Sequence, residues 1–170
     1  MTTERTHWWP AYVGIGSNLD SPASQVEQAL KLLAAINDTI LTARSGLYRS
    51  APVGPAGQPD FINAAAALLT RLSAPALLEQ LQIIETAQGR VRDGERWGPR
   101  CLDLDLLVYS SHTMKTPDLE LPHPRIAERN FVLLPLSEIA SHVTVPGLKS
   151  VGALAADVSR STPRIEKIDR

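Results

Sequence analysis

Residues 96–109 read RWGPRCLDLDLLVY, and this stretch decides the fold because it predicts an arginine-rich loop that runs directly into a β-strand. Residues two apart on a strand point to the same face, so Asp103 and Asp105 project side by side while the leucines beside them face the core. Each of two neighbouring carboxylates disfavours the ionised state of the other, and a bound cation removes that cost. Carboxylate oxygens favour Mg²⁺ or Mn²⁺ over softer metals, so the pair predicts a metal site.

A half-exposed strand without any metal shows the same alternation of polar and apolar residues, and on the aspartate pair alone this alternative stays open. The residues before the strand favour the metal. Four arginines fall within eleven positions: Arg90, Arg92, Arg96 and Arg100. Because guanidinium groups bind anionic oxygens, arginines and metal-binding carboxylates together indicate phosphoryl-type transfer from a nucleotide.

Length and composition predict one globular domain over 1–170, with residues 1–9 as a tail. The chain has 44% hydrophobic and 21% charged residues and a net charge of −1. This balance argues against a binder of nucleic acid or of membrane surfaces, which carries a basic excess. Six of the thirteen arginines lie between Arg90 and Arg129, which suits a small anionic ligand. We expect a monomer that acts on small molecules.

The single cysteine, Cys101, excludes an internal disulfide and fits a reducing compartment. We interpret it as a small packing residue, because no second cysteine or paired histidines complete a zinc site. The first ten residues lack the apolar segment of a signal peptide, and no apolar run approaches the roughly 20 residues that span a bilayer. We therefore expect a cytoplasmic protein.

The order of predicted elements gives the fold class. Strands are predicted at 12–16, 40–48, 61–69 and 103–109, with helices at 22–33 and 74–88 that begin at Ser21-Pro22 and Ala74-Pro75. This βαββαβ order is the split βαβ pattern of a ferredoxin-like α+β sandwich, with a central, mainly antiparallel sheet and helices packed on it. Additional C-terminal elements are expected at 125–128, 132–140, 143–145 and 150–158, of which 143–145 is a short strand and the others are helical.

Other polar residues stand where they suggest a ligand site. Asn63 shares a strand face with Phe61, and its amide suits the edge of a heterocycle, although an amide bonded to local backbone is the alternative. His123 lies between two prolines and six positions before Arg129, a pair of donors suited to phosphate. The segment 14–18, GIGSN, lacks the spacing of a phosphate-binding loop, so we interpret it as a tight turn between strand and helix.

These pieces together resemble the 6-hydroxymethyl-7,8-dihydropterin pyrophosphokinases of folate biosynthesis, over a region from Tyr12 to about Ala140. The matching segments are YVGIGSNL at 12–19, YRSAP at 48–52, QPDFINA at 58–64, GRVR at 89–92, RWGPRCLDLDLL at 96–107 and LPHPR at 121–125. The segment 96–107 resembles the diagnostic motif of the family at every defined position.

The resemblance implies transfer of the β,γ-pyrophosphoryl group of ATP to the hydroxymethyl oxygen of the pterin, with AMP as by-product. It implies that Asp103 and Asp105 bind two Mg²⁺ ions and act in catalysis with Arg90 and Arg100. The implied pterin contacts are Ser50, Phe61, Asn63, Trp97 and Phe131, and the implied nucleotide contacts are Glu85, Arg92, His123 and Arg129. Two residues depart from the family pattern: Pro124 stands where some members have an aromatic residue, and Cys101 where Thr is common.

Two loops, 51–60 and 89–100, are expected to close over the substrates as lids do. Two other functions remain possible on the residues. A non-catalytic ferredoxin-like binding module has no need of paired aspartates beside arginines, and a metal-dependent nucleotide hydrolase has no need of a ring site at Asn63, Phe61 and Phe131.

Overall fold

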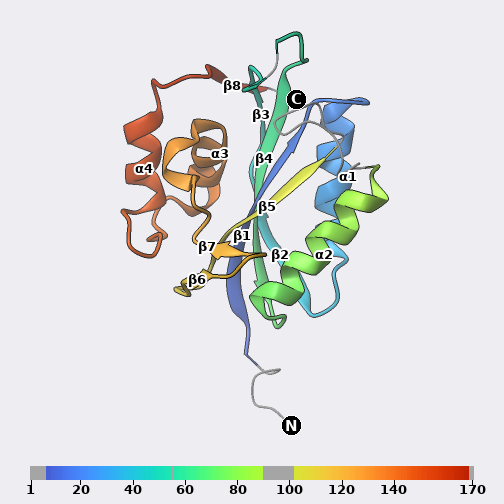
Figure 1. The fold of residues 1–170 in the computed structure, drawn as a ribbon, viewed down its shortest axis with the longest axis vertical. Coiled ribbons are helices and arrows are strands. Elements are labelled where there is room, and N and C mark those ends of the chain that lie inside the picture. The colour runs from blue at the N-terminus through green and yellow to red at the C-terminus, as the bar shows by residue number, and fades with distance from the viewer. Residues whose placement is uncertain (1–6, 55, 90–101, 169–170) are drawn as a thin grey trace.

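The computed structural model describes residues 7–54, 56–89 and 102–168. Within them, three layers are seen in Figure 1, with a β-sheet between two pairs of helices. One pair is α1 (Pro22–Ala34) and α2 (Ala74–Ala87), and the other is α3 (Asn130–Ala140) and α4 (Val151–Val158). The 3-10 helix η2 (Ile126–Glu128) precedes α3. No helix of the described segments is long and apolar enough to cross a bilayer.

The sheet confirms the predicted ferredoxin-like fold. Its strands are β1 (Trp9–Ser17), β2 (Thr39–Arg44), β3 (Leu47–Ser50), β4 (Phe61–Thr70), β5 (Asp103–Tyr109) and β8 (Ile165–Ile168). They run in the order β5-β1-β4-β3-β8, with β2 also paired to β4, and every pairing is antiparallel. The α1 and α2 connections place β1 and β4 at the centre and β5 outside β1, as the split βαβ pattern requires.

Both predicted helices on the first face form, but they begin differently. Helix α2 begins at Ala74-Pro75 as predicted, and Ser73 before it caps the helix, because its side chain accepts a hydrogen bond from the Ala76 N–H. Ser21 makes no such bond at the start of α1; it has a left-handed backbone with φ of 61°, and only its carbonyl accepts from Gln25. Helix α1 therefore begins at Ser21-Pro22 as predicted, but no side-chain hydrogen bond caps it there.

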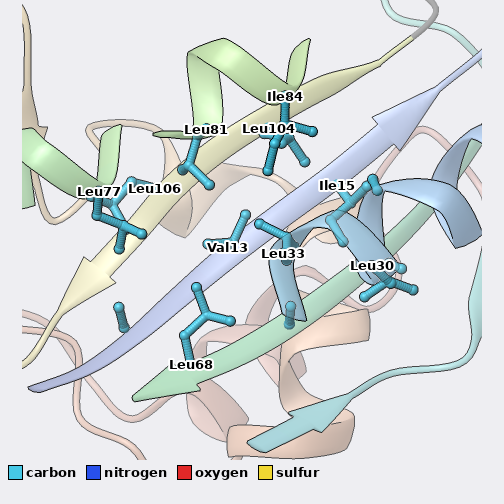
Figure 2. Close-up of a cluster of buried hydrophobic side chains, with 14 of the residues drawn as sticks. Val13, Ile15, Leu30, Leu33, Leu68, Leu77, Leu81, Ile84, Leu104 and Leu106 are labelled. Carbon is cyan, nitrogen blue, oxygen red and sulfur yellow. The ribbon is translucent and has the colours of Figure 1, made fainter. Parts of the chain in front are cut away.

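The main hydrophobic core lies between the sheet and the α1–α2 pair (Figure 2). Its labelled members are Val13, Ile15, Leu30, Leu33, Leu68, Leu77, Leu81, Ile84, Leu104 and Leu106. Leu102, Leu104 and Leu106 are buried as predicted, whereas Leu78 is only partly buried because it lines a cavity described below. A second core, containing Leu107, Leu133 and Leu136, lies against α3 and α4. The two cores together fix the sheet between its helix layers.

The predicted strand at 40–48 is instead two strands, β2 and β3, separated at Ser45 and Gly46. The buried Ser45 Oγ accepts the Ala65 N–H at 2.8 Å and donates to the Gly46 carbonyl at 2.7 Å. The Gly46 N–H points to Glu138 of α3, with which it forms a 2.7 Å bond. Because a side chain and another helix take the place of ladder partners here, the strand is interrupted.

Other boundaries also differ from the predictions. Residues 143–145 form no strand, only an isolated bridge between Thr144 and Ser150. A short hairpin, β6 (Met114–Lys115) and β7 (Glu120–Leu121), was not predicted. The described chain enters β1 at Trp9, which packs on the main core, so the predicted tail of 1–9 extends into the fold.

The edge strand β8 was also missed. It pairs with β3, and Lys167 of β8 lies 2.6 Å from the Glu138 carboxylate, which also accepts from the Tyr48 hydroxyl at 2.8 Å. Upstream, the amide of the buried Asn130 donates to the carbonyls of Ser161 and Pro163 at 3.0 and 2.6 Å. The C-terminal segment is thereby tied to both α3 and the sheet.

Candidate functional site

A cavity of about 480 Å³ opens beside β5, and residues of both α2 and α3 contribute to its lining. Nine of the predicted site residues line it: Ser50, Phe61, Asn63, Glu85, Asp103, Asp105, His123, Arg129 and Phe131. They come from six separate segments of the chain, so the fold brings together what the sequence keeps apart. Arg90, Arg92, Trp97 and Arg100 lie outside the described residues, as do Arg96 and Cys101, and their roles stay predictions.

The two aspartates occupy the start of β5 and both face this cavity. Asp103 is paired with Gly16 of β1 and Asp105 with Gly14. The glycines lack side chains, so this part of the cavity floor is bare backbone. The interpretation of 14–18 as a tight turn is therefore wrong, since residues up to Ser17 belong to β1. Gly14 and Gly16 lie two positions apart and therefore on the same face of the strand. This spacing could have predicted a stretch of sheet surface without side chains.

Asn63 lies across the same glycine from Asp103. Gly16 is paired with Asn63 of β4 on one side and with Asp103 of β5 on the other. Directly paired residues point to the same face of a sheet, and two strand spacings separate Asn63 from Asp103 by about 10 Å. A Cβ added at Gly16 would lie 3.5 Å from Asn63 Oδ1 and 3.7 Å from the Phe61 ring. The amide and the carboxylate therefore face one space, with Gly16 between them.

The buried amide of Asn63 is held by its nitrogen. Nδ2 donates to Ser50 Oγ at 2.8 Å and reaches the Tyr48 carbonyl at 3.4 Å. Within the described segments, no donor meets Oδ1, and the residue lines the cavity. These bonds from the amide nitrogen orient the whole side chain, and the prediction that Asn63 contacts a heterocycle stays a prediction. The carbonyl oxygen is left available to a ligand.

Basic groups line the site close to the aspartates. Arg129 lies 3.8 Å from the Asp105 carboxylate and its guanidinium is 5.7 Å from the centre of the Phe131 ring. The His123 N–H donates to the Leu107 carbonyl at 2.8 Å, which fixes this segment to the outer edge of β5. Arg125, which the prediction omitted, also lines the cavity.

His123 is a neutral imidazole at neutral pH. Its burial, and next the nearby positive charge of Arg129, lower the pKa of His123 from 6.5 to about 4. The Arg125 backbone N–H donates to His123 Nδ1 at 3.2 Å. An accepting Nδ1 assigns the hydrogen to Nε2, so the ring offers one N–H donor.

Glu85 lines the cavity from α2, with only 2% of the residue exposed. Its Oε2 accepts the backbone N–H of Leu104 at 2.7 Å. Leu104 lies between the two aspartates, so this carboxylate contacts the strand that carries them. The role predicted for Glu85 in binding nucleotide stays a prediction.

The cavity also contains residues that the sequence did not single out. Gln82 and Leu78 lie one and two turns before Glu85 on α2, and Val53 with Ala51 comes from the predicted lid at 51–60. The helical spacing of 78, 82 and 85 was the available signal. The 51–60 loop is tied to β1 by the Asn18 amide, which donates to the Pro59 carbonyl at 3.1 Å and to Gln58 at 3.2 Å.

The donors fit a hard divalent cation. Two carboxylates on one strand face line a cavity whose remaining space can hold anionic oxygens. Mg²⁺ binds in this manner, through one or two carboxylates together with substrate phosphates and water. The described residues contain no cluster of three or more acidic, histidine or cysteine ligands, so an all-protein metal cage is not found among them.

Comparisons with known proteins show which family the chain resembles. The family model of the 7,8-dihydro-6-hydroxymethylpterin-pyrophosphokinases (HPPK) matches residues 12–141. The 2-amino-4-hydroxy-6-hydroxymethyldihydropteridine pyrophosphokinase of Haemophilus influenzae is 44% identical over 144 residues, 85% of this chain and 89% of the relative. The protein of that name from Pseudomonas aeruginosa is 46% identical over 145 residues, with the same coverage of 85% and 89%.

The fold is also found in a solved structure. A Plasmodium falciparum HPPK-DHPS structure with pterin and p-hydroxybenzoate superimposes with a TM-score of 0.74 at 12% sequence identity. The match covers 95% of this chain but 48% of that one, so this chain spans about half of the solved protein. From the family match over residues 12–141, and the two relatives above 40% identity, the chain belongs to the 7,8-dihydro-6-hydroxymethylpterin-pyrophosphokinase family.

Proposed function

We propose that the cavity beside β5 is the active site of an ATP-dependent pyrophosphokinase of folate biosynthesis. The protein transfers the β,γ-pyrophosphoryl group of ATP to the hydroxymethyl oxygen of 6-hydroxymethyl-7,8-dihydropterin, and the α–β phosphoanhydride bond breaks to release AMP. One observation supports this site above all others. Asn63 and Asp103 flank Gly16 on one sheet face, about two strand spacings apart, which suits a heterocycle beside a phosphate chain.

The pterin occupies the Asn63 side in this proposal. Asn63 Oδ1 accepts a hydrogen bond from the ring edge, while Ser50 Oγ holds the amide nitrogen at 2.8 Å and prevents the side chain from turning. Phe61 and Phe131 line the same cavity and supply apolar ring surface. Trp97 is proposed to contact the pterin from the loop that precedes β5.

The phosphates occupy the side of Asp103, Asp105 and Arg129. The two carboxylates would hold two Mg²⁺ ions, which neutralise charge on the phosphate oxygens during transfer. Arg129 and the neutral His123 donate hydrogen bonds to phosphate oxygens in this arrangement, and Arg90, Arg92 and Arg100 are proposed to add further contacts. Such a reaction depends on alignment and charge stabilisation rather than on a covalent enzyme intermediate.

We further propose that the protein works as a monomer in the cytoplasm, with small molecules as its partners and no nucleic acid or membrane. The net charge of −1 supports the absence of a polyanionic partner. In this proposal the arginines between Arg90 and Arg129 bind one small anion, ATP.

The test is an assay of ATP, Mg²⁺ and 6-hydroxymethyl-7,8-dihydropterin with separation of the nucleotide products, using the wild type and Asp105→Asn. AMP that forms only when the pterin is present, and falls by at least about a hundredfold in Asp105→Asn, supports the proposal. Asp118→Asn, an exposed aspartate outside the cavity, is the matched control and keeps wild-type turnover. Hydrolysis without pterin would favour the nucleotide hydrolase, and binding without turnover would favour the binding module.

A further inference from the structure

The backbone of β5 is held at two points on its outer edge, and neither point uses another strand. Among the strands that the structure describes, β5 is the last of its sheet and pairs with β1 alone. Every second N–H and C=O of such a strand points outward and needs a different partner. The Glu85 carboxylate accepts a hydrogen bond from the outward backbone N–H of Leu104 at 2.7 Å. The backbone N–H of His123 donates to the outward carbonyl of Leu107 at 2.8 Å. The two contacts bracket Asp105.

Glu85 reaches this edge from the last turns of α2. It follows Leu77, Leu81 and Ile84, which are buried in the main core and fix the helix against the sheet (Figure 2). With 2% of Glu85 exposed, its carboxylate has little freedom to leave the Leu104 N–H. The helix thereby sets the position of the peptide between Asp103 and Asp105. A carboxylate that orients the residues bearing metal ligands commonly governs metal affinity without touching the metal.

We propose that Glu85 is a positioning residue, which holds the Leu104 peptide so that both aspartates face the cavity at the spacing needed for divalent cations. This inference rests on the proposed role of the aspartate pair. It assigns to Glu85 an action through the backbone, beside the nucleotide contact that stays a prediction. The hydrogen bond needs an acceptor oxygen at the end of a side chain of this length, and it does not need a negative charge.

Two substitutions separate the effect of the length of the Glu85 side chain from the effect of its charge. Glu85→Gln keeps the length and a carbonyl oxygen but removes the charge, whereas Glu85→Asp keeps the charge and shortens the side chain by one methylene. The probe is Mn²⁺, titrated by electron paramagnetic resonance in the presence of a non-hydrolysable ATP analogue. Amide hydrogen exchange of Leu104, followed by NMR, reports the bond itself. Glu79→Gln, an exposed position on the same helix, is the control.

The expected result is that Glu85→Asp increases the exchange rate of the Leu104 amide and weakens Mn²⁺ binding by about ten- to a hundredfold. Glu85→Gln stays within about threefold of the wild type in both measurements, and Glu79→Gln is unchanged. Equal losses in Glu85→Gln and Glu85→Asp would show that the charge acts on the ligands, and would overturn the proposal. Faster Leu104 exchange with unchanged Mn²⁺ affinity would overturn it too.

A reference variant distinguishes a failure of this inference from a failure of the proposed function. Asp105→Asn is titrated with Mn²⁺ under the same conditions. If it binds Mn²⁺ as tightly as the wild type, the aspartate pair is not the metal site and the proposed function fails with the inference. If Asp105→Asn loses affinity and Glu85→Asp does not, the positioning role alone is wrong.

Discussion

The guanidinium of Arg129 lies 3.8 Å from the carboxylate of Asp105, so the arginine proposed to bind phosphate partly neutralises an aspartate proposed to bind metal. Both side chains are partly buried, and Arg129 also lies over the ring of Phe131. A cation bound at Asp105 would compete with this ion pair. We therefore expect metal binding to be coupled to the release of Arg129 toward phosphate.

We expect Arg129→Ala to change metal and nucleotide affinity in opposite directions. Unit charges about 4 Å apart interact by about 1 kcal/mol even in bulk water, so Mn²⁺ binding without nucleotide should strengthen roughly fivefold. ATP binding should weaken at least tenfold, since a charged donor to phosphate is lost. Calorimetric titration with Mn²⁺ and then with the ATP analogue measures both. Arg49→Ala, which removes an exposed pairing with Glu166, is the control, and weakening of both ligands in Arg129→Ala would contradict the coupling.

Asn63→Ala should raise the KM for the pterin at least tenfold and leave the KM for ATP within about twofold. The variant loses the carbonyl that faces the cavity, and Ser50 Oγ loses the amide that it orients. Steady-state kinetics with each substrate varied in turn gives the two values. Equal increases for both substrates would mean that Asn63 supports the cavity as a whole and does not read the pterin.

Stability should depend on His123 in mildly acidic solution. The pKa of His123 is about 4 in the folded protein and 6.5 as the ordinary value, so between these pH values the unfolded chain binds more protons. The free energy of unfolding therefore falls as the pH drops from 6.5 toward 4. Urea unfolding across this window should show a smaller fall in His123→Gln than in the wild type. His142→Gln, at an exposed position, should keep the wild-type fall; equal slopes in all three proteins would rule out the contribution of His123.

Asn130→Ala should destabilise the fold by about 1–3 kcal/mol, because the buried amide that donates to Ser161 and Pro163 is removed. We expect faster amide exchange first in β8 and then in its partner β3. Urea unfolding gives the free energy, and Asn37→Ala, an exposed asparagine, should stay within about 0.5 kcal/mol of the wild type. A stable Asn130→Ala protein with unchanged exchange in β8 would contradict the anchoring of the C-terminal segment.

The sequence predicts best where burial and spacing agree. The alternation of leucine and aspartate in β5 identified both the buried leucines and the face that carries the aspartates, because successive side chains of a strand point to opposite faces. The Ala74-Pro75 pair located the first turn of α2, and the βαββαβ order was enough to predict the fold class. The cavity contains every predicted site residue that the structure describes.

The features that were not predicted from the sequence depend on partner residues that are distant along the chain. The end of the first strand at Ser17 and the floor role of Gly14 and Gly16 follow from pairing with β4 and β5. The four-residue strand β8 is too short for a recognisable alternation of polar and apolar residues, and it forms because it pairs with the free edge of β3. The bond from Glu85 to Leu104 joins a helix to a strand edge, which no periodicity reports.

The measurement that tests the central claim most directly follows the β-phosphorus of ATP. Wild-type protein is incubated with ATP labelled at that phosphorus, Mg²⁺ and 6-hydroxymethyl-7,8-dihydropterin, and the products are separated. We expect the label to move to the pterin product, with one AMP formed for each pterin consumed and no AMP formed without pterin. Label retained in ADP, or released as inorganic phosphate without pterin, would contradict pyrophosphoryl transfer at this site.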